Sequence, residues 1–153
     1  MQPQVCSHNI LKRECKVCDK IGYITKLFRG RLHAAYRSRG AVRTQRSHTI
    51  VGCSWAEFVA HIERKMAQWN ATCAPGQEMT WENTDRDHIK PISLAKDEAE
   101  LLALHHFTNY QPLLRADNLR KSTRWGERDE AHWRAEIFHK PEYTEIYFPV
   151  SML

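Results

Sequence analysis

The sequence contains three short segments in this order: Asp87-His88-Ile89-Lys90-Pro91-Ile92, Thr108-Asn109-Tyr110-Gln111-Pro112-Leu113 and Asn118-Leu119-Arg120-Lys121. The first segment and residues 109–113 predict two short paired strands, each limited by its proline. Residues 115–122 predict a helix that carries Asn118 in its early turns. Because neighbouring strand residues point to opposite faces, Asp87 and His88 can share a site only if they lie at the end of their strand.

These segments supply the groups that a metal-dependent phosphodiesterase requires. Hydrolysis of a phosphodiester needs an activated water, neutralisation of charge on the phosphorane oxygens and stabilisation of the departing 3′ oxygen. An imidazole can activate water near neutral pH, and carboxylate and amide oxygens are ligands that Mg²⁺ and Mn²⁺ prefer. Together with residues 51–58 and 79–83, the segment over residues 50–122 resembles the small phage-type HNH nucleases, the His-Me finger or ββα-metal family, in the variant whose third letter is Asn.

The resemblance implies a DNA endonuclease with an α+β fold that is mostly helical and contains a ββα-metal finger. It implies that His88 is the general base and that Asp87 and Asn118 hold the catalytic Mg²⁺ or Mn²⁺. Asn109 would tie down the loop between the strands and orient His88 without touching the substrate. An asparagine at the third position keeps an oxygen ligand and disfavours a softer catalytic metal such as Zn²⁺. Cleavage would leave 5′-phosphate and 3′-hydroxyl ends.

Two other interpretations of these residues stay open. His88 can be a satisfied histidine of the core, or an inactive finger can belong to a zinc-containing nucleic-acid-binding module. The joint set of Asp87, His88 and Asn118 favours the enzyme, because a protein that only binds has no need of all three. The Cys-x-x-Cys pairs that brace some HNH cores are missing around this motif, so burial of apolar side chains must hold the finger: Trp81, Leu101, Leu104, Phe107, Leu113 and Leu119.

The N-terminal segment supplies four candidate metal ligands, Cys6, His8, Cys15 and Cys18. Tetrahedral zinc takes thiolates and imidazoles, and a Cys-x-x-Cys pair lets two sulfurs meet one ion across a tight turn. So short a segment cannot bury a core of its own. The sequence therefore predicts a zinc-knuckle-like module stabilised by a structural zinc ion, which contributes ~10 kcal/mol or more in comparable peptides. Reduced cysteines that only lie near one another, and a redox pair, are the alternatives, although no thioredoxin-like βαβ pattern follows.

The net charge of +5 is concentrated in one segment. Residues 20–56 contain no acidic residue and eight of the 23 basic ones, so the rest of the chain, with all 18 acidic residues, has a negative balance. Such a block is typical of a protein that binds a polyanion, because each neutralised phosphate releases condensed counterions. A solvated basic face without a specific partner is the alternative. The candidate DNA contacts are Lys26, Arg29, Arg37, Arg39, Arg43 and Arg46, together with Arg120 and Lys121.

The hydrophobic periodicity predicts helices over residues 21–37 and from Ser54 to about residue 69, the second begun by a capping box of Ser54 and Glu57. An arginine-rich loop is expected over residues 38–47, and a surface helix is expected after Asp97. Four parts are expected: a zinc-knuckle-like module (1–19), a basic helix and linker that form a DNA-binding arm (20–49), the HNH domain (50–125) and a C-terminal extension that packs on the domain (126–153).

The sequence lacks an apolar signal core and any run of about 20 apolar residues. We therefore expect an intracellular protein, in the cytoplasm of a bacterial or phage-infected cell. Its expected partner is double-stranded DNA, with no role for a membrane, and it would act as a monomer or a dimer. The expected function is cleavage of DNA, with Mg²⁺ or Mn²⁺ as the catalytic ion and Zn²⁺ as a structural one.

Overall fold

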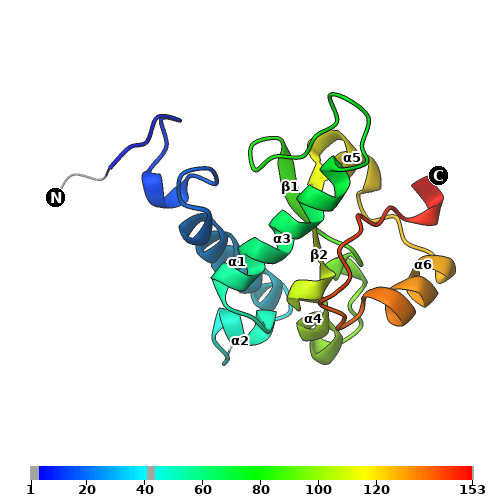
Figure 1. Ribbon diagram of the computed structural model, residues 1–153. Helices are drawn as coiled ribbons and strands as arrows, with labels where there is room; N and C mark the ends of the chain where they lie inside the picture. The colour runs from blue at the N-terminus through cyan, green and yellow to red at the C-terminus, as the bar shows by residue number, and fades with distance from the viewer. Residues whose placement is uncertain (1–3, 41–43, 153) are drawn as a thin grey trace. The chain divides into compact units, whose positions relative to one another are not determined.

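The fold is α+β, with a two-stranded antiparallel sheet and several helices (Figure 1). The computed structural model describes residues 4–40 and 44–152. The helices are α1 (Lys20–Arg37), α2 (Ser47–Val51), α3 (Trp55–Asn70), α4 (Glu98–Leu104), α5 (Arg115–Lys121) and α6 (Glu127–His132), and the strands are β1 (Thr84–His88) and β2 (Tyr110–Leu114). In the described ranges no helix is long and apolar enough to cross a bilayer.

The chain divides into two compact units, one reaching to Val59 and the other beginning at Ala60. The first unit starts with a narrow hairpin, in which Val5 bridges Leu11 and the backbone N–H of Cys6 donates to the carbonyl oxygen of Ile10 at 2.9 Å. A 3-10 turn at Lys12–Glu14 follows and leads towards α1. The expected division into four parts stays a prediction.

Helix α1 confirms the helix expected over residues 21–37. Asp19 caps it by accepting a hydrogen bond from the backbone N–H of Gly22 at 2.8 Å. One face of α1 is buried at helical spacing, through Ile24, Phe28, Leu32 and Tyr36. The apolar stripe therefore fixes α1 within the first unit, since burial of such side chains is the main stabilising term of a short packed helix.

Helices α2 and α3 follow the arginine-rich loop, of which Arg43 lies outside the described residues. Helix α2 ends at Gly52, whose positive φ of 80° is easily adopted only without a side chain. The predicted capping box of α3 is confirmed: the backbone N–H of Ser54 donates to Glu57 Oε2 at 2.8 Å, and the backbone N–H of Glu57 donates to Ser54 Oγ at 3.2 Å. The α3 helix then runs to Asn70, one residue past the expected end.

The two strands of the second unit pair with His88 opposite Tyr110 and Asp87 opposite Gln111. The first strand was expected over residues 87–92, and this placement was wrong, because β1 spans Thr84–His88. The backbone N–H of Ile89 still donates to the carbonyl oxygen of Asn109 at 2.8 Å, but the next N–H donates to the side chain of Asn109. The side-chain amide thus ends the ladder before Pro91 does.

Helix α5 follows β2 directly and lies beside β1, which gives the order strand, strand, helix (Figure 1). Most of the apolar residues expected to hold this element are buried, namely Trp81, Leu101, Leu104 and Leu113. Phe107 is half-buried. Leu119 was expected to be buried and is 79% exposed, because Asn118 and Lys121 occupy the side of α5 that faces β1.

The short helix after Asp97 is confirmed as α4, which Asp97 caps. A small core joins it to the chain beyond β1 and to the C-terminal region, through Ile89, Leu104, Trp133 and Ile137. Residues near the C-terminus also bond to β2: the backbone N–H of Tyr147 donates to Gln111 Oε1 at 2.8 Å, and Gln111 Nε2 donates to the Tyr147 carbonyl at 2.9 Å. The C-terminal segment therefore forms part of the support of the sheet.

Candidate metal centre and candidate active site

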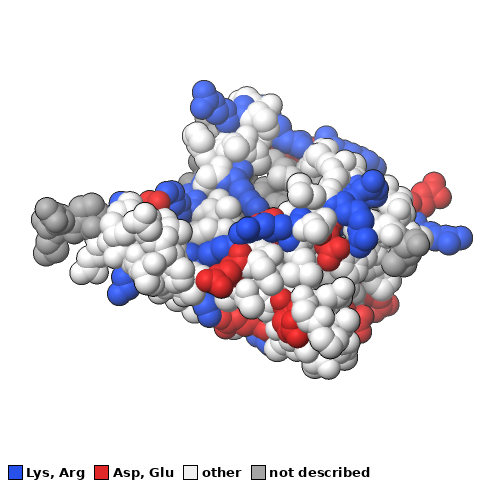
Figure 2. Space-filling view, turned by 90° about the horizontal axis from the view of Figure 1, so that it is seen from above, with Lys and Arg blue, Asp and Glu red and all other residues white. Residues whose placement is uncertain are grey.

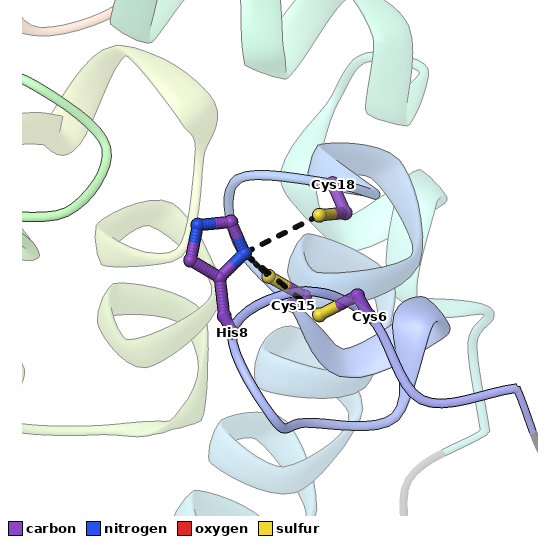
Figure 3. A group of neighbouring side chains, drawn as sticks. All are labelled: Cys6, His8, Cys15 and Cys18. Carbon is purple, nitrogen blue, oxygen red and sulfur yellow. Dashed lines mark hydrogen bonds between the residues drawn. The ribbon is translucent and has the colours of Figure 1, made fainter.

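The four N-terminal ligand candidates converge on one point (Figure 3). Their ligand atoms all lie within 4.8 Å of one another. The Sγ atoms of Cys15 and Cys18 are each 3.4 Å from His8 Nδ1, and Cys6 Sγ is 3.8 Å from it. Ligands of one tetrahedral zinc ion, at about 2.0 to 2.3 Å from the metal, lie roughly 4 Å apart. The cluster could therefore hold a metal such as zinc.

Local backbone geometry brings these residues together. Asn9 turns the hairpin between Cys6 and Ile10 with a positive φ of 57°. Gly22, in the first turn of α1, allows a close approach: a Cβ atom there would lie 2.5 Å from Asp19 Oδ2 and 2.7 Å from the carbonyl oxygen of Arg13. The glycine thus lets the segment that precedes Cys15 pack against the start of α1.

The thiols of the cluster differ in acidity. Burial tends to raise the pKa of Cys6, but hydrogen bonds from the backbone of His8 and Ile10 outweigh it and lower this pKa to about 6. Burial, followed by contacts with the neighbouring Cys15 and Cys6, raises the pKa of Cys18 to about 11. Metal binding requires thiolates, so a cation at the centre would have to displace protons from part of this cluster.

The candidate active site begins on the face of β1 that α5 covers. Asp87 accepts hydrogen bonds from Gln111 Nε2 at 3.2 Å and from Lys121 Nζ at 3.3 Å. Two positions earlier on the same face, Asp85 accepts a hydrogen bond from Asn118 Nδ2 at 3.3 Å. The structure therefore brings Asp87 and Asn118 to one face of the sheet, with Asp85 as a further acid beside them.

Lys121 is an internal residue. Its side chain is 1% exposed, and its ammonium lies 3.1 Å from Asp87 Oδ2 and donates to the backbone carbonyl of His88 at 2.8 Å. The predicted phosphate contact of Lys121 does not fit this burial. Arg120, the other predicted contact on α5, is exposed and forms an ion pair with Asp117 at 3.0 Å.

His88 is the last residue of β1, the position that Asp87 and His88 need if they are to share a site. Its ring lies on the face opposite Asp87, where its centroid is 4.2 Å from that of Tyr110 and 5.2 Å from that of His105. His105 Nδ1 and the Tyr110 hydroxyl are in turn 3.0 Å apart. With 9% of its surface exposed, His88 lies at the margin of the interior. The dyad therefore shares the end of β1 rather than one face of it.

Asn109 is buried and makes four hydrogen bonds through its side chain. Its Oδ1 accepts from the backbone N–H of Lys90 at 2.9 Å and from Trp133 Nε1 at 2.9 Å. Its Nδ2 donates to the carbonyl oxygens of Leu104 at 2.8 Å and of Lys90 at 3.1 Å. This amide ties the segment after His88 to the end of α4 and to the C-terminal region, and its predicted effect on the orientation of His88 stays a prediction.

Three contributors to this region were missed in the sequence. Asp85 precedes Asp87 by two positions, a spacing that places both on one face of a strand, but the strand was expected to start only at Asp87. Gln111 bonds to Asp87 across the strand pair, and its residue type alone does not signal this contact. Trp133 comes from a distant segment, and no local pattern signals its bond to Asn109.

Two further histidines near the site, His61 and His106, have environments that keep their rings neutral. Burial, with a contribution from the charge of Lys65, lowers the pKa of His61 to about 3, and this ring lies 3.2 Å from the backbone carbonyl of Tyr110. Burial and the nearby His139 lower the pKa of His106 to about 4. Both rings are therefore neutral near pH 7, and His106 bonds to Thr108 within its own loop.

The basic residues of the first unit differ in their surroundings. Lys26 forms an ion pair with Glu14 at 2.8 Å, while Arg37 and Arg39 are exposed. Arg29 and Arg46 line a hollow of about 350 Å³ together with Ser47, His48 and Trp55. On the face drawn in Figure 2, lysine and arginine side chains form several groups, with acidic side chains between them. Their contact with DNA stays a prediction.

Comparison of the chain with models of protein families, with curated proteins and with solved structures finds no match.

Proposed function

We propose that the protein is a DNA endonuclease of the HNH type, dependent on Mg²⁺ or Mn²⁺. The observation that carries the proposal is that Asp87 and His88 occupy the last two positions of β1, while α5 places Asn118 on the side of the same strand that bears Asp85 and Asp87, within the order strand, strand, helix. A binding module has no need of this combination of an imidazole and two oxygen ligands around one strand. The resemblance of residues 50–122 to HNH nucleases also supports the proposal.

The donors on the α5 face of β1 fit a hard divalent cation. Asp87 and Asn118 would hold the ion, with the carboxylate of Asp85 next to Asn118. The amide of Asn118 directs its nitrogen to Asp85, which leaves its carbonyl oxygen as the end that a metal would take. The ammonium of Lys121, already at Asp87, indicates that this carboxylate attracts positive charge. When bound, the metal would neutralise charge on the phosphate and stabilise the departing oxygen.

His88 would accept the proton of the attacking water. His88 lies at the last position of β1. A phosphodiester bound at this end of the strand could therefore contact the His88 ring on one face and the Asp87 carboxylate on the other. Lys121 supports both groups at once, because its ammonium bonds to the carboxylate of Asp87 and to the backbone of His88. Asn109 would orient this strand end through the segment that follows it.

We further propose that the N-terminal cluster binds one structural zinc ion. Three sulfurs and one imidazole nitrogen are the ligand set of many structural zinc sites, and the hairpin that carries Cys6 and His8 has little core of its own. Purified protein should contain one zinc per chain. Cys18→Ser should lower the zinc content and leave the structure around β1 unchanged. A protein that is fully folded with no zinc would contradict this assignment.

The nuclease proposal is tested on supercoiled plasmid DNA with Mg²⁺ or Mn²⁺ over a range of salt. Wild-type protein should produce nicked circles, because one site cuts one strand, and double-strand cleavage would need a dimer or a second encounter. His88→Ala and Asn118→Ala should each abolish nicking while DNA affinity stays the same. Plasmid that stays supercoiled with wild-type protein at every salt concentration would refute the proposal, and nicking by His88→Ala at the wild-type rate would exclude His88 as the base.

The second candidate function is a zinc-containing nucleic-acid-binding module with an inactive finger. The observation that favours it is the low exposure of His88, whose ring contacts Tyr110 and His105, together with the ion pair that Asp87 makes with Lys121. This alternative predicts DNA binding with no cleavage in any divalent metal, and identical behaviour of wild-type protein and His88→Ala.

A further inference from the structure

The hollow beside Trp55 has the chemistry of a nucleotide site. It is lined by Arg29 from α1, by Arg46, Ser47 and His48 at the start of α2, and by Trp55 at the start of α3. Two guanidinium groups, an imidazole and an indole surround it, and none of the lining residues is acidic. A surface of this composition attracts an anion that also carries an aromatic group.

The two arginines are available to such a ligand. Both Arg29 and Arg46 are exposed, and within residues 4–40 and 44–152 no carboxylate forms an ion pair with either. Lys26, one turn before Arg29 on α1, differs in this respect because Glu14 already neutralises it. Guanidinium groups bind phosphate oxygens through two parallel N–H donors, which makes a pair of unneutralised arginines a natural phosphate contact.

Trp55 gives the hollow an aromatic wall. Its ring rests on Phe28, with centroids 5.2 Å apart and planes tilted by 39°, and Phe28 is itself fully buried. The indole is therefore held in place from one side while it stays half-buried and lines the hollow. A rigid aromatic side chain beside arginines is the arrangement on which single-stranded nucleic acids stack their bases.

We propose that this hollow binds one unstacked nucleotide of a DNA strand, with the base on Trp55 and its phosphate on Arg29 and Arg46. The bases of an intact duplex already stack on one another and are not open to an indole, so the ligand is a single-stranded or frayed segment. This inference rests on the proposed function only in taking the nucleic acid to be DNA. It adds a preference for substrates with unpaired nucleotides next to the duplex.

The test measures the affinity of the full-length, zinc-loaded His88→Ala protein for a fluorescent 12-nucleotide single strand and for the matching duplex. Trp55→Leu keeps an apolar contact with Phe28 and removes the aromatic face, whereas Trp55→Phe keeps an aromatic face. Trp55→Leu should weaken single-strand binding by about 5-fold to 150-fold, the contribution of one base stack, and change duplex binding by less than about 2-fold. Trp55→Phe should restore most of the single-strand affinity.

Arginine variants separate the phosphate contact from general attraction. Arg46→Ala should weaken single-strand binding and reduce the slope of log affinity against log salt by about 0.7, as expected for the loss of one phosphate contact on a single strand. Arg128→Ala, an exposed arginine of α6 that is neither in the hollow nor among the candidate DNA contacts, is the control, and it should leave the single-strand affinity and the slope unchanged. Circular dichroism and zinc content must match the parent protein for each variant.

Two results would overturn the inference: single-strand affinity of Trp55→Leu within about 2-fold of the parent, or an equal loss for single strand and duplex, which would indicate backbone contact only. Neither result bears on cleavage, because the binding assay uses His88→Ala. If wild-type protein fails to nick plasmid while Trp55→Leu loses single-strand binding, the nuclease proposal falls and the nucleotide site stands.

Discussion

Replacement of Asn109 by alanine should mainly lower the stability of the fold, whereas replacement of Asn118 by alanine should mainly abolish the proposed nicking activity. Asn109 makes four buried hydrogen bonds, to the backbone N–H and C=O of Lys90, to the carbonyl of Leu104 and to the indole of Trp133. A hydrogen bond of this kind contributes about 1 kcal/mol net, and a buried partner left without one costs at least as much. Asn109→Ala should therefore lower the free energy of unfolding by ~4 kcal/mol.

Asn118 is the matched control, because it is the same residue type in the same unit. It is half-buried, and within the described part of the chain its side chain makes one long hydrogen bond, 3.3 Å to Asp85. Asn118→Ala should change the free energy of unfolding by less than about 1 kcal/mol. Under the proposed function it should nevertheless abolish nicking, whereas Asn109→Ala should keep weak nicking at temperatures where it is folded.

Urea unfolding of zinc-loaded protein, followed by far-ultraviolet circular dichroism and tryptophan fluorescence, measures both free energies. The slope of the free energy against urea should stay the same in the two variants, since neither changes the surface that unfolding exposes by much. A loss below about 1 kcal/mol for Asn109→Ala would refute the bracing role derived from its four bonds. Equal destabilisation by Asn118→Ala would refute the distinction between a bracing and a ligand asparagine.

Substitutions in α1, at Lys65 and at Lys121 test other parts of the fold. Gly22→Ala should destabilise the first unit in thermal melts, because its Cβ would lie 2.5 Å from Asp19 Oδ2, whereas Gly30→Ala, with nothing within 4 Å, should stabilise α1 by about 0.5 to 1 kcal/mol. Burial lowers the pKa of Lys65 to about 7, below the unfolded value of about 10.4, so the unfolded chain binds more protons between these values and stability should rise with pH across this window. Lys65→Met should flatten that rise in urea midpoints measured at pH 7 and pH 10. Lys121→Met should cost about 3 to 5 kcal/mol by leaving a largely buried carboxylate without its ammonium, and adding Asp87→Asn should recover much of the loss.

Local patterns in the sequence predicted the elements that are stabilised by interactions between residues close together in the chain. The capping box of Ser54 and Glu57 fixes the start of α3 by bonds within four residues, and the apolar spacing of α1 fixes its buried face. The four N-terminal ligand candidates also lie within a short segment, so their spacing was sufficient to predict that they would meet. In each case the deciding interactions span few residues along the chain.

The features that could not be predicted depend on partners distant in sequence. β1 ends at His88 because the side chain of Asn109, about twenty residues later, accepts the backbone N–H of Lys90. Lys121 is buried because Asp87 neutralises it on the face of β1 that α5 covers, and a lysine without such a partner belongs on the surface. Leu119 is exposed for the same reason, since the two polar residues beside it occupy the inner side of α5.

The two candidate metal sites differ in what holds them together. On the sheet, the carboxylates of Asp85 and Asp87 are offset by Arg115, at 3.8 Å, and by the buried ammonium of Lys121. Backbone pairing with β2 fixes the strand that carries these two carboxylates. The N-terminal ligands have a hairpin closed by one bridge and thiols of unequal acidity. On the sheet, a metal would therefore bind to side chains whose backbone is already fixed. At the N-terminus, metal binding would complete the local fold, because the bonds to the ion would hold the four ligand residues together.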